Sequence, residues 1–131
     1  MESKAHFVKL KMTEYKDYTI IDYNDDSLYM LGAFLARAIM GDLSYNFFTD
    51  WLKGKYEQDE AFGNAYGLRE RDGKVYPGFI WDPEEEHFKY FGTTKEYMLQ
   101  LIDDWVQVII QKPNTILMTK KNGTIEFTIE D

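Results

Sequence analysis

Residues 94–111 read TKEYMLQLIDDWVQVIIQ, and this stretch decides the fold. Wound at about 100° per residue, it separates into an apolar arc and a polar arc. The apolar arc covers somewhat more than half of the circumference and contains Tyr97, Met98, Leu99, Leu101, Ile102, Trp105, Val106, Val108, Ile109 and Ile110. The polar arc contains Glu96, Gln100, Asp103, Asp104, Gln107 and Gln111. An apolar arc this wide contacts neighbours on more than one side, so we predict that this helix is the spine of the core.

The two ends of this helix carry sequence signals of their own. Thr93 is the expected N-cap, and Glu96, three residues later, would complete a capping box with it. Pro113 and Asn114 follow the last apolar residues and favour an end to the helix there.

A second apolar helix is predicted over residues 28–40. Residues 24–27, NDDS, offer several N-caps, and Gly41 stands in the expected C-cap position. Gly32 and several alanines make parts of its surface small, so that a neighbour can come close. We expect that neighbour to be the helix of residues 94–111.

A shorter helix is predicted over residues 45–53, and Gly54 closes it. Its apolar residues have helical spacing: Phe47, Phe48, Trp51 and Leu52. Because it is short and rich in aromatic residues, we expect it to cover one edge of the core.

The remaining ordered segments have the pattern of β-strands. Strands are predicted over residues 6–12, 18–23, 65–70, 74–81, 87–91, 115–119 and 124–130, and a loop over residues 55–64. Asp72-Gly73 and Asn122-Gly123 are the two strongest hairpin turns. Pro77 cannot donate to a ladder, so its strand should be an edge strand or bulged there. Hairpins segregated from helices predict an α+β fold. A mostly antiparallel sheet would pack on two main helices and one shorter helix, in a single domain over residues 1–131.

Composition narrows the class of protein. Of 131 residues, 44% are hydrophobic and 17% aromatic, which is enough for a packed core. No cysteine is present, so disulfides and thiolate zinc sites are excluded. A net charge of −8 disfavours direct binding of nucleic acid. The N-terminus lacks a signal peptide, and the longest weakly charged run is shorter than the roughly 20 residues that span a bilayer. We therefore expect a cytoplasmic protein without membrane segments.

The chain carries no recognisable catalytic motif. It has no Gly-x-Ser-x-Gly elbow, no phosphate-binding loop and no His-Glu-x-x-His. Asp103 and Asp104 are neighbours on a helix and project about 100° apart, so they do not form an acid–base dyad. We expect no enzymatic activity, no cofactor and no metal.

His87 offers the one alternative to that expectation. It has strand spacing with Glu85 and lies near Asp82, so a small metal or ligand site is conceivable. A structural metal site needs about four protein ligands, and a third cannot be named here. A surface histidine in an acidic turn is the favoured interpretation.

Two groups of residues have the character of a protein-binding surface. Residues 79–86, FIWDPEEE, place large apolar side chains beside concentrated negative charge, as interfaces do. The competing interpretation is a buried strand followed by a solvated turn. The second group is the acidic arc of residues 94–111, which has no lysine or arginine at i, i+4. Its carboxylates either bind cationic groups of a partner or lie beside Lys9 and Lys11 of the same chain.

In general character the chain resembles the immunity proteins of bacterial toxin–immunity pairs, including those of contact-dependent growth inhibition. The stretches that carry the resemblance are DPEEE (82–86), IDDW (102–105) and YEQDE (56–60). The resemblance implies a cytoplasmic toxin inhibitor that binds a cognate toxin domain, often a nuclease, and blocks its active site or substrate path. The residues expected to bind such a basic partner are Asp59, Glu60, Trp81, Asp82, Glu84, Glu85, Glu86, Asp103 and Asp104.

Three other functions compete with this one. The chain could be an interaction module of another kind, including a homodimer that pairs edge strands or helix faces. It could be a small-ligand enzyme that uses His87. It could be an acidic mimic of nucleic acid, although its charge is modest for that role.

Overall fold

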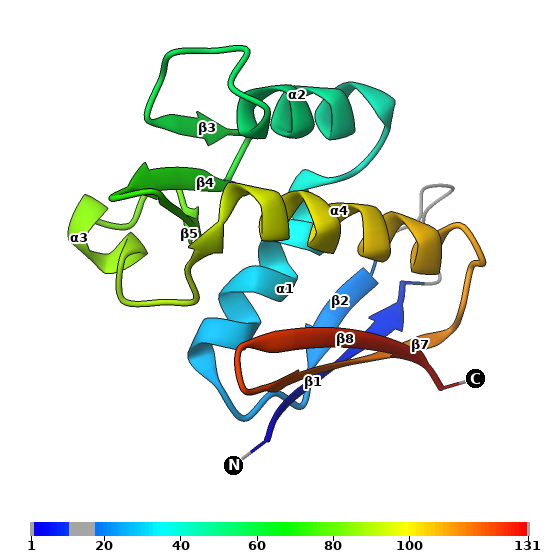
Figure 1. Ribbon diagram of the computed structural model, residues 1–131. Coiled ribbons are helices and arrows are strands. Elements are labelled where there is room, and N and C mark those ends of the chain that lie inside the picture. The colour runs from blue at the N-terminus through cyan, green and yellow to red at the C-terminus, as the bar shows by residue number, and fades with distance from the viewer. Residues whose placement is uncertain (1, 11–17, 131) are drawn as a thin grey trace.

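The protein is an α+β fold with two four-stranded antiparallel sheets (Figure 1). The computed structural model describes residues 2–10 and 18–130. The first sheet has the order β2-β1-β7-β8, built from β1 (Ser3–Lys9), β2 (Tyr18–Ile21), β7 (Thr115–Lys121) and β8 (Thr124–Ile129). The second has the order β3-β4-β5-β6, built from β3 (Glu60–Phe62), β4 (Tyr66–Arg71), β5 (Lys74–Phe79) and β6 (Thr93–Thr94). The helices are α1 (Asp26–Ala38), α2 (Asp42–Leu52), α3 (Glu84–His87) and α4 (Lys95–Ile109).

The predicted fold class is confirmed, with two sheets in place of one. Helices α1 and α4 each contact strands of both sheets and form the layer between them (Figure 1). The predicted pairing of the first two strands is also confirmed, because β1 and β2 are antiparallel neighbours. The end of the first predicted strand and the turn after it fall on residues 11–17, outside the described residues.

Helix α4 is the expected spine. Its buried side chains are Met98, Leu101, Ile102, Trp105 and Ile109. Trp105 lies among three rings of the first sheet, with centroids 4.7 Å from Phe7, 5.9 Å from Tyr18 and 5.7 Å from Phe127. The predicted capping box was wrong. Thr94, the last residue of β6, is the N-cap and accepts from the Tyr97 N–H at 3.1 Å, one residue later than predicted.

Helix α1 packs directly on the first sheet at Gly32. A Cβ atom there would lie 2.5 Å from Ile20 Cδ1 and 2.9 Å from Phe7 Cζ, so any larger residue would have to displace these side chains. The neighbour that the small residues admit is therefore a sheet. The helix closest to α4 is α2, which corrects the expectation that α1 would be. The C-cap prediction for Gly41 was also wrong, because α1 ends at Ala38 with Ile39 as its C-cap, and Gly41 is the N-cap of α2.

The two predicted hairpin turns are confirmed. Asp72 and Gly73 have φ values of 53° and 81°, and Asn122 and Gly123 have values of 53° and 78°. Left-handed backbone at both central positions is what a two-residue type I′ turn requires. Pro77 lies beyond the two residues of β5 that pair with β6, so the strand is an edge strand at that point, as predicted.

The segment between β5 and α4 departs from the prediction. Residues 87–91 were expected to form a strand. Instead, α3 occupies Glu84–His87, and the next strand, β6, begins at Thr93. Pro83 fixes φ just before α3, and three glutamates in its first turn favour the positive end of a helix. The predicted loop over residues 55–64 likewise contains strand β3, which pairs with β4.

Across residues 2–10 and 18–130, no helix has the length and apolar character needed to cross a membrane.

Candidate protein-binding surface

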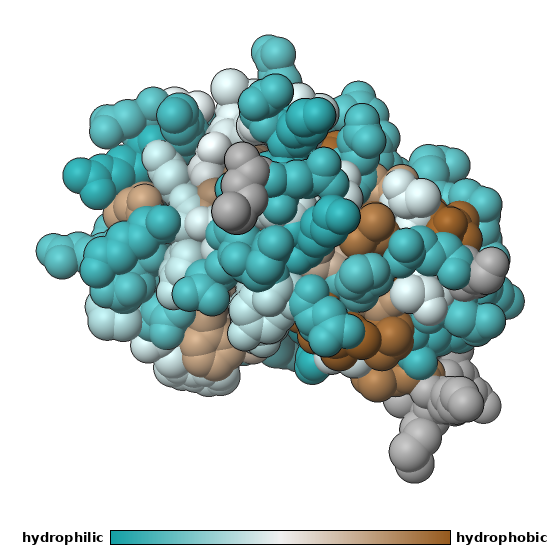
Figure 2. Space-filling model, turned by 90° about the horizontal axis from the view of Figure 1, so that it is seen from below, coloured by the Kyte–Doolittle hydropathy of each residue, from teal (hydrophilic) through white to brown (hydrophobic). Residues whose placement is uncertain are grey.

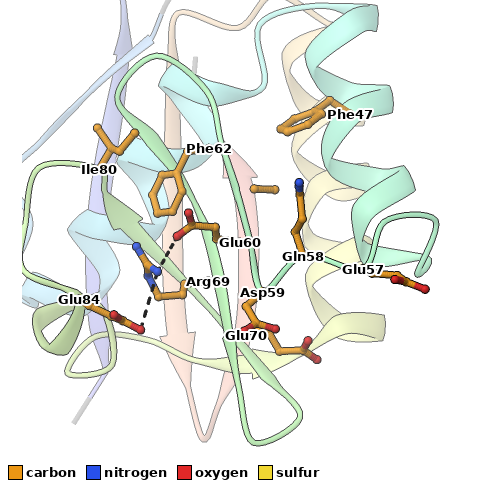
Figure 3. A pocket seen from close by; sticks show the side chains of 11 residues that line it. Phe47, Glu57, Gln58, Asp59, Glu60, Phe62, Arg69, Glu70, Ile80 and Glu84 are labelled. Carbon is orange, nitrogen blue, oxygen red and sulfur yellow. Dashed lines mark ion pairs between the residues drawn. The ribbon is translucent and has the colours of Figure 1, made fainter.

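An open hollow of about 720 Å³ brings together three of the predicted binding residues: Asp59, Glu60 and Glu84. One side of the hollow is formed by α2 and the segment that follows α2. The other side is formed by β3, β4 and α3 (Figure 3). We call it the acidic hollow, and its lining residues are Phe47, Glu57, Gln58, Asp59, Glu60, Ala61, Phe62, Arg69, Glu70, Ile80 and Glu84.

Arg69 is the basic residue among those that line the acidic hollow, on the side of Glu60 and Glu84 (Figure 3). Its Nη1 forms an ion pair with Glu60 and lies 3.9 Å from Glu84 Oε1. Its guanidinium carbon lies 5.3 Å from the centroid of the Phe62 ring, a cation–π geometry. The Arg69 side chain is largely buried, whereas the carboxylates of Glu60 and Glu84 beside it are more exposed.

Negative charge nevertheless dominates the acidic hollow. Five lining residues are acidic and one is basic. Lys95 pairs with Glu70 at 2.9 Å, but within the described part of the chain Glu57 and Asp59 form no ion pair. A concave site lined by one sign of charge concentrates its field and attracts cationic groups.

His87 lies behind the acidic hollow, fully buried. Its Nδ1 accepts from Arg69 Nε–H at 3.4 Å, and its ring centroid is 5.6 Å from that of Phe62. The expectation that His87 is a surface histidine in an acidic turn is therefore wrong. The strand face expected to join it to Glu85 does not exist either, since residues two apart on a helix point in nearly opposite directions. The described residues contain no group of three or more His, Asp or Glu placed to hold a metal ion.

The other predicted residues near α3 lie outside the acidic hollow. Trp81 is 72% exposed, with its ring centroid 5.1 Å from that of Phe79. Glu85 points to solvent, and Glu86 accepts from Lys89 Nζ at 2.7 Å. That hydrogen bond raises the pKa of Lys89 above its ordinary value. Asp82 is partly buried and does not line the hollow.

The acidic arc of α4 has neutral partners within the fold. Tyr45 Oη–H donates to Asp103 at 2.7 Å, and this hydrogen bond raises the pKa of Tyr45 above its ordinary value. Gln100 donates to Asp104 at 2.8 Å. The alternative partner Lys11 lies outside the described residues, and Lys9 forms no ion pair with either carboxylate. Neither aspartate lines the acidic hollow.

Two exposed apolar residues of α2 are not among the predicted binding residues. Leu43 is 90% exposed and Phe47 is 38% exposed, although the short helix that contains Phe47 and Phe48 was expected to cover one edge of the core. Phe47 lies about 100° around α2 from Phe48, and only Phe48 is on the buried side of the helix. Leu43 and Phe47 are spaced at i, i+4, and this spacing could have indicated that they form an apolar stripe apart from the buried side of α2.

The comparisons with known proteins found no matching family model, no similar curated protein and no similar solved structure.

Proposed function

We propose that this protein is a non-enzymatic toxin inhibitor of the immunity type, which binds a basic toxin domain in the cytoplasm and blocks it. The observation that carries the proposal is the convergence of acidic residues from β3, β4, α3 and the 53–59 segment on one open hollow. Apolar residues Phe47 and Ile80 line the same hollow and are partly exposed. Acidic charge beside exposed apolar groups is the anatomy of a surface that recognises a basic protein.

The mechanism would have two stages. The acidic hollow first steers a basic surface toward it, which speeds association in a salt-dependent way. Apolar side chains are then buried against the partner and slow dissociation. A basic nuclease cleft covered in this way loses access to its nucleic acid.

The position of His87 supports a binding role over a catalytic one. A general base must reach the proton of a bound substrate. His87, the last residue of α3, is fully buried, and its Nδ1 is engaged by Arg69. An external substrate therefore does not meet this imidazole.

Co-expression tests the proposal. The toxin domain encoded beside the gene of this protein should arrest growth when expressed alone, and co-expression of this protein should restore growth. The double variant Glu60→Lys, Glu84→Lys should restore it less well, whereas the control Glu126→Lys on β8 should act like the wild type. If the wild type gives no protection against that toxin domain, the proposal is wrong.

Self-association is a second candidate, supported by the outer face of the first sheet. No described helix covers this face, which Figure 2 shows from below with a hydrophobic area among hydrophilic side chains. Leu117 and Ile21 stand on either side of His6 in register, on the face opposite the buried core residues. The mass of the protein in solution tests this candidate, because a monomer at micromolar concentration would contradict it.

A further inference from the structure

We infer that Leu43 and Phe47, the α2 stripe, form one continuous docking surface with the acidic hollow. Its occupant is a single segment of a basic protein that carries apolar side chains on one side and lysine or arginine on the other. This inference rests on the proposed function and specifies which surface meets the partner. It places the apolar anchor on α2, whereas the sequence had placed it at Trp81.

The α2 stripe is an unpartnered helix face. The buried side of α2 consists of Phe48, Thr49, Trp51 and Leu52, which pack toward the core. Leu43 and Phe47 lie one turn apart on another side, and Leu43 is almost completely exposed. A leucine in that position contributes nothing to the packing of the fold, and exposed apolar residues that adjoin one another mark interaction sites.

Phe47 joins the α2 stripe to the acidic hollow. Its side chain lines the hollow from the α2 side, opposite Phe62 and Ile80 (Figure 3). Its ring centroid is also 6.3 Å from that of the half-exposed Tyr56. Apolar surface therefore continues from Leu43 into the hollow, where the carboxylates begin.

The charges decide what kind of segment fits. Arg69 is already engaged by Glu60 and Glu84, whereas Glu57 and Asp59 have no cation within the described chain. These two carboxylates are complementary to a lysine or arginine of the partner. Nucleic acid would be repelled here, and a small polyamine would leave the α2 stripe uncovered. A segment with both apolar and cationic side chains satisfies both halves of the surface.

Phage display tests this inference. A library of random 16-residue peptides is selected for binding to the wild-type protein. Enriched peptides should combine lysine or arginine with leucine or aromatic residues. Their affinity should fall about tenfold on Leu43→Ser and about tenfold on the double variant Glu57→Gln, Asp59→Asn. The matched controls Ile110→Ser at the C-cap of α4 and Asp72→Asn in the β4–β5 turn, both exposed, should bind like the wild type.

Several results would overturn the inference. Peptides that bind both test variants as well as the wild type would place the docking surface elsewhere. The absence of enrichment over the starting library would show that the surface accepts no such segment. If light scattering finds a dimer that Leu43→Ser converts to a monomer, the occupant is a second copy of this chain.

Growth rescue separates this inference from the proposed function. If Leu43→Ser protects cells from the toxin domain as fully as the wild type does, the docking surface is wrong and toxin inhibition stands. If the peptides behave as expected but the wild type gives no protection, the docking surface stands and its partner is a basic protein of another kind.

Discussion

Arg69 Nε–H donates to Nδ1 of the fully buried His87 at 3.4 Å, and this contact joins the acidic hollow to the interior of the fold. The same guanidinium pairs with Glu60 on β3 and approaches Glu84 on α3. One side chain of β4 thus contacts a strand and a short helix, including the buried imidazole of that helix.

Replacing Arg69 with methionine should therefore destabilise the protein. The variant Arg69→Met keeps an apolar stem, leaves the buried His87 Nδ1 without a donor and leaves Glu60 and Glu84 without their cation. We expect a loss of about 1–3 kcal/mol in the free energy of unfolding, measured by urea denaturation. The control Arg71→Met removes a more exposed arginine of the same strand and should cost less. Equal losses in the two variants would contradict this stabilising role of Arg69.

Gly78 is the residue that makes room for His87. A Cβ atom at Gly78 would lie 2.7 Å from His87 Nδ1 and 2.9 Å from Cγ, inside a packed region. Gly78→Ala should therefore cost about 1–3 kcal/mol, seen as a lower thermal unfolding midpoint. At Gly63 the nearest atom to a Cβ would be 3.5 Å away, an ordinary contact, so Gly63→Ala serves as the matched control. A midpoint for Gly78→Ala close to that of the control would mean that His87 moves freely.

Asp25 should make stability depend on acid pH. Burial alone raises the pKa of Asp25, but hydrogen bonds from Ser3, Lys120 and the Ser27 N–H outweigh it and hold the pKa below its ordinary value. A depressed carboxyl pKa contributes stability above the unfolded-state value of about 3.9, and the contribution is lost as the pH falls through the folded-state value.

The variant Asp25→Asn isolates that charge, because asparagine remains a good N-cap for α1. The difference in unfolding free energy between wild type and Asp25→Asn should be constant from about pH 5 to 7 and should shrink below about pH 4. The exposed neighbour gives the control Asp26→Asn, whose difference should change less. A difference for Asp25→Asn that does not vary between pH 3 and 7 would rule out the depressed pKa.

Local sequence patterns correctly predicted those elements whose structure depends on a few residue types. The apolar arc around Trp105 predicted α4, and Asp72-Gly73 and Asn122-Gly123 predicted two hairpins, because few other residues adopt that backbone. His87 shows the limit of such patterns. The alternation of HFKYF is typical of a strand, but Pro83 and the glutamates after it begin a helix, and Gly78 on another element provides the space that buries the imidazole.

The candidate surface was only partly predictable for a related reason. Asp59, Glu60 and Glu84 could be identified as acidic residues of interest, yet their convergence follows from how the second sheet packs beside α2. Arg69 had no distinctive sequence context. The exposure of Phe47 depends on which of two adjacent aromatic residues the core accepts, and tertiary packing decides that in favour of Phe48.

The glutamates of α3 provide a sharp test of the acidic hollow, because neighbouring residues have different surroundings. Glu84 lines the hollow, whereas Glu85 is exposed outside it. The variants Glu84→Gln and Glu85→Gln each remove one charge from the same short helix. If a basic toxin domain docks in the hollow, Glu84→Gln should slow its association several-fold at low salt and weaken the salt dependence of the rate. Glu85→Gln should have a smaller effect. Stopped-flow association rates between about 50 and 300 mM salt measure both quantities. Equal slowing by the two variants would mean that only the total charge of α3 matters, and that the partner does not enter the hollow.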